Sequence, residues 1–305
     1  MGLLYTAAGL TLWGLIWIEA ILMAIVVFTI ISPVSYLLGG RVGHARTLNT
    51  MVDKLIWYHM VWMLEVWGGS RIELYGDELP VRESALLISN HIFLADFWPF
   101  FSIALRKGRL GCIKIFSKNN VKYLPGFGWG GWLMGFVFIR RNWTADAATI
   151  LSTFANLNDT GLPIWLLSHP ESTRISPEKY EQSVAYQKQN DHLPALDHLL
   201  LPRTKGFVAT VGALRATLLD AVYDLTVDYP QGFPGMFNTA AGAGPRIVIH
   251  IKRHPIETLP EDPAELKQWC LDRWVEKDAL LEGFRSTGSF PDPIEAPFEY
   301  LPMNI

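Results

Sequence analysis

The first forty residues are the most apolar part of the chain, with hydrophobic side chains dominating from Leu3 to Leu38. A bilayer-spanning helix needs about 20 such residues, so the run predicts one long helix or a hairpin that bends near Ser32 and Pro33. A cleaved signal peptide fits less well, because the run is long and has no basic leading segment. Glu19 is costly at bilayer depth, so we expect it to contact a polar partner or to lie at the membrane interface.

A second apolar segment, rich in tryptophan, covers residues 51–68. It also carries polar and charged side chains, namely Asp53, Lys54, His59 and Glu65. These favour an amphipathic helix half embedded in the membrane over a helix that spans it. Tryptophan prefers the headgroup level, which supports the same interpretation. A plain core helix is the alternative.

From Ile72 onward, short apolar runs alternate with helical patterns. The runs predict strands at residues 72–75, 85–89, 110–116, 136–139, 164–167, 221–227 and 246–251. Helices are expected between most of them, at residues 97–105, 145–156 and 203–219. This alternation predicts an α/β fold with a mainly parallel sheet flanked by helices. In such folds the functional groups gather at strand ends and in the loops that follow.

Three later segments complete the picture. Residues 177–198 are polar and predict a helix followed by a loop, whereas residues 230–245 are rich in glycine, alanine and proline and predict a loop. Residues 266–281 predict an amphipathic helix. We therefore expect a membrane-anchoring helical segment at residues 1–70, an α/β domain at 71–290 and a proline-rich tail at 291–305.

Composition narrows the class of protein. Half of the residues are hydrophobic and 12 are tryptophan, which suits a protein that sits at a bilayer. The net charge of -3 argues against a nucleic-acid partner. The two cysteines, Cys112 and Cys270, lie in apolar stretches, where buried free thiols are expected rather than a disulfide. No cluster of cysteine and histidine has zinc spacing, so no metal or cofactor is predicted.

A histidine and an acid follow one of the predicted strands. The strand at 85–89 is followed by His91, and Asp96 comes five positions later, near where a helix can begin. A carboxylate on one ring nitrogen fixes the tautomer and leaves the other nitrogen free as a general base. The spacing alone is weak, because His192 and Asp197 repeat it. We expect His192 to be a solvated loop residue.

Three further blocks follow in order: Gly135-Phe-Val-Phe-Ile-Arg-Arg141, Pro163-Ile-Trp-Leu-Leu-Ser-His-Pro-Glu-Ser-Thr-Arg174 and Leu200-Leu-Pro-Arg-Thr-Lys-Gly206. Together with the histidine block, this order resembles the glycerolipid acyltransferase family, which includes the lysophosphatidic acid acyltransferases. The four family blocks are His-x4-Asp, Gly-x-x-Phe-Ile-x-Arg, Glu-Gly-Thr-Arg and a proline-containing block. The resemblance covers about residues 85 to 285, and the joint match is far more specific than any single block.

Finer features resemble one branch of that family. Lys118 and the stretches 124–129 and 220–227 look like the eukaryotic members. The stretch Ile249-His-Ile-Lys-Arg253 and the stretch Trp269-Cys-Leu-Asp-Arg-Trp-Val-Glu-Lys277 are similar to lysocardiolipin and lysophosphatidylinositol acyltransferases. One position departs from the pattern, because Ser172 stands where the family usually has glycine. If this position needs a positive φ, serine carries strain that glycine avoids.

The resemblance implies a set of roles. His91 is the general base and Asp96 orients it, so the acyl group passes directly from acyl-CoA to the acceptor without an enzyme serine nucleophile. Arg141 and Arg174 match the arginines that contact phosphate, which suits the planar fork of guanidinium. Two further residues have less definite roles: Glu171 contacts the acceptor or orders the loop, and Lys118 contacts an anionic head group or is solvated.

The resemblance also implies a location, the endoplasmic reticulum membrane. The basic residues Arg41, His44, Arg46 and Lys54 follow the first apolar run, which predicts a cytosolic catalytic domain by the positive-inside rule. Two glycosylation sequons begin at Asn142 and Asn158. We expect both to be unused, because glycosylation needs exposure to the lumen.

These observations predict an acyl-CoA-dependent lysophospholipid acyltransferase at a lipid bilayer, with acyl-CoA as co-substrate. Lysophosphatidylinositol is the expected acceptor, and lysophosphatidic acid is the alternative within the class. A catalytically silent membrane scaffold on the same fold is an alternative from another class, against which the intact His91 and Asp96 weigh. A lipid hydrolase fits less well, because the sequence has no Gly-x-Ser-x-Gly elbow.

Overall fold

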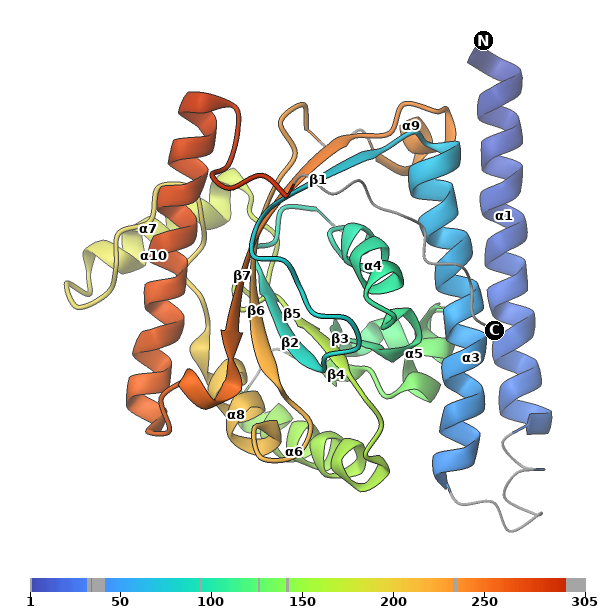
Figure 1. The fold of residues 1–305 in the computed structure, drawn as a ribbon, viewed down its shortest axis with the longest axis horizontal. Coiled ribbons are helices and arrows are strands. Elements are labelled where there is room, and N and C mark those ends of the chain that lie inside the picture. The colour runs from blue at the N-terminus through green and yellow to red at the C-terminus, as the bar shows by residue number, and fades with distance from the viewer. Residues whose placement is uncertain are drawn as a thin grey trace.

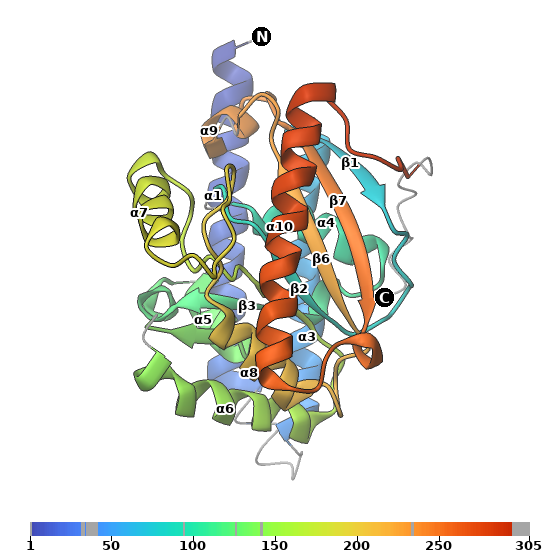
Figure 2. The same cartoon turned by 90° about the vertical axis from the view of Figure 1, so that its left-hand side faces the viewer.

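The structure is a computed structural model, which describes residues 2–31, 34, 42–93, 95–125, 127–140, 143–232 and 235–294. One twisted sheet runs through the middle of the molecule, with helices on both of its faces (Figure 1). In a view turned by 90°, α10 lies along one face of the sheet and α1 stands behind it (Figure 2).

The sheet has seven strands in the order β1-β7-β6-β2-β5-β3-β4. Their bounds are Arg71–Gly76 (β1), Ala85–Ser89 (β2), Ile113–Lys118 (β3), Val137–Ile139 (β4), Trp165–Ser168 (β5), Ala221–Asp228 (β6) and Arg246–Pro255 (β7). Strands β6 and β7 are antiparallel, and all other neighbouring pairs are parallel. This confirms the predicted α/β fold with a mainly parallel sheet.

The central strand β2 shows why its sequence is a continuous apolar run. All five of its residues are buried. Successive side chains point to opposite faces of a strand, so Ala85 and Leu87 join one hydrophobic core while Leu86 and Ile88 join the other. Burial on both faces removes the polar positions that a half-exposed strand shows.

Helices cover the two faces of the sheet. One group packs near α4 and consists of α1 (Gly2–Val26), α3 (Val42–Trp62), α4 (Phe97–Arg106) and α5 (Phe127–Met134). The other group consists of α6 (Trp143–Thr160), α7 (Pro177–Lys188), α8 (Thr204–Leu214) and α10 (Pro263–Thr287), and α8 contacts both α6 and α10. Short π or 3₁₀ turns lie at Val27–Ile31, Met63–Trp67, Leu110–Cys112, Asn119–Tyr123 and Ile256–Thr258.

Two segments differ from their predictions. The stretch 230–245 contains a short helix, α9 (Gly235–Ala240), where a loop was expected. Its six residues are rich in small side chains, so no helical periodicity marks it. Helix α10 is longer than its predicted stretch, because Asp262 caps its first turn by accepting from the amides of Ala264 and Glu265, and Gly288 ends it with φ 76°.

Helix α1 packs one side against the rest of the protein. The ring of Trp13 stacks on Trp98 of α4 at 4.9 Å, and the expected polar contact of Glu19 is made by His59 of α3 at 3.1 Å. Its outer side stays apolar and exposed, with Leu3, Leu4, Leu10, Leu15, Ile18 and Leu22. Within the described residues, Gly2–Met23 is the one helical stretch long and apolar enough to cross a membrane.

The tryptophan-rich segment 51–68 is helical and packs one side against the core, and its half-embedded position in a membrane stays a prediction. Trp57 is only 2% exposed, and Val61, Met63 and Leu64 are also buried. Arg106 of α4 donates to both carboxylate oxygens of Glu65, at 2.8 and 2.7 Å. Glu65 is therefore paired inside the protein, although its charge had indicated a side that faces water.

Several other expectations can be compared with the structure. Cys112 and Cys270 are both free thiols, but only Cys270 is buried as expected, and Cys112 is partly exposed. Burial raises the pKa of the Cys270 thiol. No group of three potential metal ligands occurs among the described residues. The proposed bend at residues 32–33, Arg41, the sequon at Asn142 and the tail from 295 onward lie outside the described residues.

Candidate active site

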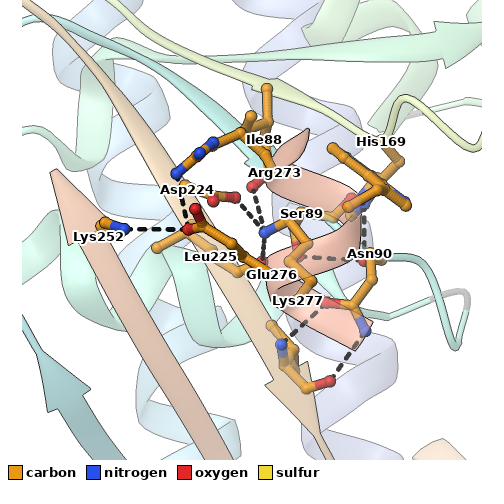
Figure 3. A network of polar contacts seen from close by, with 12 residues as sticks. Ile88, Ser89, Asn90, His169, Asp224, Leu225, Lys252, Arg273, Glu276 and Lys277 are labelled. Atoms are coloured by element: carbon orange, nitrogen blue, oxygen red, sulfur yellow. Dashed lines mark hydrogen bonds and ion pairs between the residues drawn. The ribbon is translucent and has the colours of Figure 1, made fainter. Parts of the chain in front are cut away.

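The site begins where β2 leaves the sheet. The side-chain amide of Asn90 donates to the carbonyl of Val227 and accepts from the amide of Val227, both at 2.9 Å. This side chain therefore continues the pairing of β2 with β6 after the β2 backbone has turned away (Figure 3). The turn places His91 at the carboxyl edge of the parallel strands, where α/β folds bind ligands.

Asp96 holds His91 and the loop that follows it. The Nδ1 atom of His91 lies 2.9 Å from Oδ2 of Asp96. The same oxygen accepts from the amides of Ile92 and Phe93 at 2.6 and 2.9 Å, and the hydroxyl of Tyr229 donates to Oδ1 at 2.9 Å. The Asp96 side chain is 1% exposed and His91 is 17% exposed. With Nδ1 engaged, Nε2 is the ring nitrogen left to react with a substrate.

A second histidine lies against the first. The ring of His169, just after β5, stacks on His91 with centroids 4.2 Å apart and planes 14° apart. Its Nδ1 lies 3.2 Å and 3.1 Å from the carbonyl oxygens of Ser89 and Asn90, so it must carry the proton and donate. Burial lowers the pKa of His169 to about 3, and the ring stays neutral at physiological pH.

Glu171 links the third block to the histidine loop. It is 3% exposed. One carboxylate oxygen accepts from the amide of His91 and the other from Nε1 of Trp274, both at 3.3 Å. Burial raises the pKa of Glu171 from its ordinary 4.5 to about 8, against these two donors and Lys277, which favour the carboxylate. This geometry agrees with the loop-ordering role, one of the two expected for Glu171.

The raised pKa of Glu171 makes stability depend on pH. The folded state keeps a proton that the unfolded state releases above about pH 4.5, so this stabilisation is lost as pH rises toward 8. Replacing Glu171 with glutamine removes the titration. We expect the melting temperature of the wild type, relative to that of the variant, to fall between about pH 4.5 and about pH 8 and to stay level above that range. A constant difference, measured by differential scanning fluorimetry, would contradict the raised pKa.

Ser172 does adopt a positive φ, the condition under which serine was expected to carry strain at this position. Its φ is 60°, and its amide donates to the carbonyl of His169 at 2.8 Å to close a tight turn. A left-handed residue other than glycine costs about 1–2 kcal/mol. Serine therefore carries strain here that the usual glycine of the family avoids.

We expect Ser172→Gly to be more stable than Ser172→Ala by about 1 kcal/mol, because only glycine relieves the strain at positive φ. Alanine serves as the matched control, since both variants lose the hydroxyl that donates to the carbonyl of Pro170 at 3.3 Å. Chemical denaturation of the two variants measures the difference. Equal stabilities would show that the turn carries no such strain.

A cavity of about 920 Å³ opens beside His91. Its lining includes five basic side chains, Lys118, Lys179, Arg203, Lys205 and Lys267. The acids in the lining are Asp146 and Glu171, which are both buried; Asp146 accepts from the amide of Arg140 at 2.9 Å. The charge balance of the lining therefore favours an anionic ligand.

The sequence-predicted site residues are only partly brought together. His91, Glu171 and Lys118 line the cavity, and Asp96 lies behind His91. Arg174 is exposed and is not among the lining residues, although the amide of the next residue donates to the carbonyl of His91 at 2.9 Å. Arg141 lies outside the described residues.

His192 is exposed, as expected for a solvated loop residue. It nevertheless lines the same cavity, which the sequence did not indicate. Within the described part of the chain, no hydrogen bond or ion pair joins it to Asp197, whose amide instead donates to Asp278 at 2.9 Å. The repeated His-x4-Asp spacing therefore does not produce a second dyad.

Sequence reasoning missed four residues of this site, namely Asn90, His169, Tyr229 and Trp274. One signal for His169 was available, because parallel strands end at the same edge of a sheet and His169 follows β5 as His91 follows β2. Tyr229 likewise follows β6. Trp274 had no such signal, since it reaches the site from a distant helix.

Comparison with known proteins places this arrangement in a family. Residues 71–227 match the sequence profile described as Acyltransferase, and residues 241–304 match the one described as Acyltransferase C-terminus. A 1-acyl-sn-glycerol-3-phosphate acyltransferase 2 of Brassica napus is 34% identical over 81% of this chain. The same comparison covers 64% of that relative, so this chain spans less than two thirds of its length.

Two further relatives agree. The 1-acyl-sn-glycerol-3-phosphate acyltransferase 3 of Arabidopsis thaliana is 34% identical over 89% of this chain and 72% of its own length. The 1-acyl-sn-glycerol-3-phosphate acyltransferase delta of Homo sapiens is 33% identical over 81% of this chain and 66% of its own length.

Among solved structures, the 1-acyl-sn-glycerophosphate (LPA) acyltransferase PlsC of Thermotoga maritima is similar with a TM-score of 0.47 and 16% identity, covering 85% of this chain and 96% of that one. The sequence matches confirm the resemblance to glycerolipid acyltransferases that the four blocks indicated. The chain therefore belongs to the acyltransferase family.

Proposed function

We propose that this protein is an acyl-CoA-dependent lysophospholipid acyltransferase that moves a fatty acyl group to the free hydroxyl of an anionic lysophospholipid. The observation that carries the proposal is the His91–Asp96 pair, in which Asp96 contacts Nδ1 of the histidine and His91 lines a basic cavity. An alcohol is a poor nucleophile until a base removes its proton. The pair supplies that base, and the cavity suits two substrates that both carry phosphate.

The reaction follows from the pair. Nε2 of His91 takes the proton of the acceptor hydroxyl while the oxygen attacks the thioester carbonyl carbon. The carbon–sulfur bond breaks, and the imidazolium returns the proton to the CoA thiolate. Asp96 holds the ring and stabilises its positive charge during transfer. The acyl group thus passes directly to the acceptor, and the histidine ends in its starting form.

The cations divide between the two substrates in this proposal. Arg141 and Arg174 take the acceptor phosphate, as their positions in the family blocks imply, and Lys118 at the end of β3 adds a positive charge to the lining of the cavity. Arg203 and Lys205, at the start of α8, also line the cavity and suit the phosphates of CoA. Guanidinium binds phosphate oxygens through two parallel hydrogen bonds, which lysine cannot reproduce.

Lysophosphatidylinositol is the proposed acceptor, supported by the likeness of the stretches at 249–253 and 269–277 to that branch. Lysophosphatidic acid is the second candidate, favoured by the names of the relatives, which are 1-acyl-sn-glycerol-3-phosphate acyltransferases. The test offers labelled acyl-CoA with lysophosphatidylinositol, lysophosphatidic acid and lysophosphatidylcholine, and identifies products by mass. If no product forms with any of the three acceptors, the proposed activity is rejected, and a catalytically silent scaffold on the same fold is favoured.

We further propose that the protein resides in the endoplasmic reticulum membrane with its catalytic domain in the cytosol. The apolar outer side of α1 supports the membrane. The side-chain amide of Asn158 donates to the carbonyl of Ala213 at 3.3 Å and accepts from the Thr217 hydroxyl at 2.7 Å, so a glycan there would disrupt both contacts. A mobility shift after endoglycosidase treatment would overturn this orientation.

A further inference from the structure

The C-terminal helix α10 carries a lysine that is wholly enclosed by the protein. Lys277 is 0% exposed. Its ammonium group forms an ion pair with Asp224 of β6, donates to the carbonyl of Leu225 at 2.6 Å and lies 3.5 Å from the carbonyl of Ile88 (Figure 3). Lys277 therefore joins β6 to the end of β2, three residues before the catalytic histidine.

One turn earlier, the same helix contacts the catalytic loop by a second route. Trp274 donates to Glu171 at 3.3 Å, and Glu171 in turn accepts from the amide of His91. The ammonium of Lys277 lies 5.3 Å from the centre of the Trp274 ring, within the range of a cation–π contact. Two side chains of α10 thus approach His91, one through β2 and one through Glu171.

Stability alone gives a weak reason for this arrangement. Enclosing an ion pair has a desolvation cost that can exceed the attraction between the charges, and packed apolar residues are often as stabilising. An exposed ion pair between Glu276 of α10 and Lys252 of β7 is 3.0 Å long and avoids that cost. The enclosed pair lies at the end of β2, the strand that leads into His91. This location suggests that the pair serves the site rather than stability alone.

We propose that Trp274 and Lys277 are positioning residues for His91, so that the C-terminal helix takes part in acyl transfer by holding the loop that carries the base. This inference rests on the proposed function. Neither side chain touches a substrate in this scheme. Lys277 holds the carbonyl of Ile88, and Trp274 holds the carboxyl group of Glu171. Through these two groups they fix the backbone before His91 and at His91, and so the orientation of the imidazole.

The main test compares the double variant Asp224→Leu/Lys277→Met with the wild type. It removes both charges together, so that no unpaired charge is left inside the protein. We expect kcat to fall at least about tenfold with both KM values changed less than about threefold, since a misplacement of about 1 Å can cost about a hundredfold in rate. Glu276→Gln, next to Lys277 on the same helix, is the matched control and should retain the wild-type kcat.

A second readout does not depend on turnover. Diethyl pyrocarbonate modifies accessible imidazoles, and peptide mass spectrometry gives the rate at His91. We expect this rate to change at least about threefold in the double variant and to stay unchanged in Glu276→Gln. If the wild type transfers no acyl group, the proposed function fails, while the modification rates still decide the positioning role.

Trp274→Phe provides an independent variant if the double variant does not fold. It keeps an aromatic ring but removes the N–H that Glu171 accepts. We expect a lower kcat and a changed modification rate at His91. A wild-type kcat together with a wild-type modification rate, in either folded variant, would overturn the proposal and leave these residues a structural role only.

Discussion

Replacement of His91 by alanine should lower kcat by about 10²–10⁴-fold, because the general base is lost from the reaction. Folding should be retained, since His91 is partly exposed and belongs to neither hydrophobic core. The measurement is the initial rate of transfer from labelled acyl-CoA to the best acceptor in the panel. Melting curves on the same preparations separate loss of catalysis from loss of fold.

His192→Ala is the matched control for this prediction. His192 has the same sequence spacing to an acid and lines the same cavity, but it lacks the aspartate contact that orients His91. We expect its removal to change kcat by less than about threefold, since no proton transfer depends on it. Equal losses in the two variants would mean that the dyad is not the base.

Asp96→Asn should reduce kcat at least about 100-fold and also destabilise the protein. The carboxylate accepts four hydrogen bonds, from the His91 ring, the amides of Ile92 and Phe93, and the Tyr229 hydroxyl. An asparagine amide has only one oxygen to accept with, so at least one donor in this buried cluster is left unsatisfied, at about 1–3 kcal/mol. The imidazolium formed during transfer also loses its counter-charge.

Tyr229→Phe separates these two effects. It removes one donor from Asp96 and leaves the contact with His91 in place. We expect a smaller loss of activity than in Asp96→Asn, with melting temperature and kcat measured side by side. If kcat falls as far as in Asp96→Asn, the hydroxyl of Tyr229 is needed for the activity of His91 as well as the contact with Asp96.

The fold could be predicted from sequence because its central strands are buried on both faces. The run 85–89 has no polar position before Ser89, and the run 221–227 is apolar except for the buried Asp224 and Thr226; each run matches one strand of the sheet to within one residue. One charged position in segment 51–68 could not be interpreted from sequence alone. Glu65 was expected to contact water, but it is paired with Arg106 from α4, a helix that no local pattern connects to it.

The site was predictable only where its residues share a motif. His91 and Asp96 are five positions apart, so one loop brings them together. His169 and Lys277 reach the same region from the end of β5 and from α10. In a sequence, a lysine on an amphipathic helix indicates the solvated side, and only the sheet beneath α10 shows that Lys277 faces inward.

The position of β1 sets an order of events during synthesis. This strand lies at the edge of the sheet and pairs with β7, with Arg71 opposite Arg246. A ribosome adds roughly 5–20 residues per second, so β1 leaves the ribosome on the order of ten to thirty seconds before its partner exists. The apolar α1 has emerged by then and can already have entered a bilayer. A chain that stops before β7 would keep the anchor and carry an unpaired strand at the membrane surface, the kind of exposed edge on which other chains can pair.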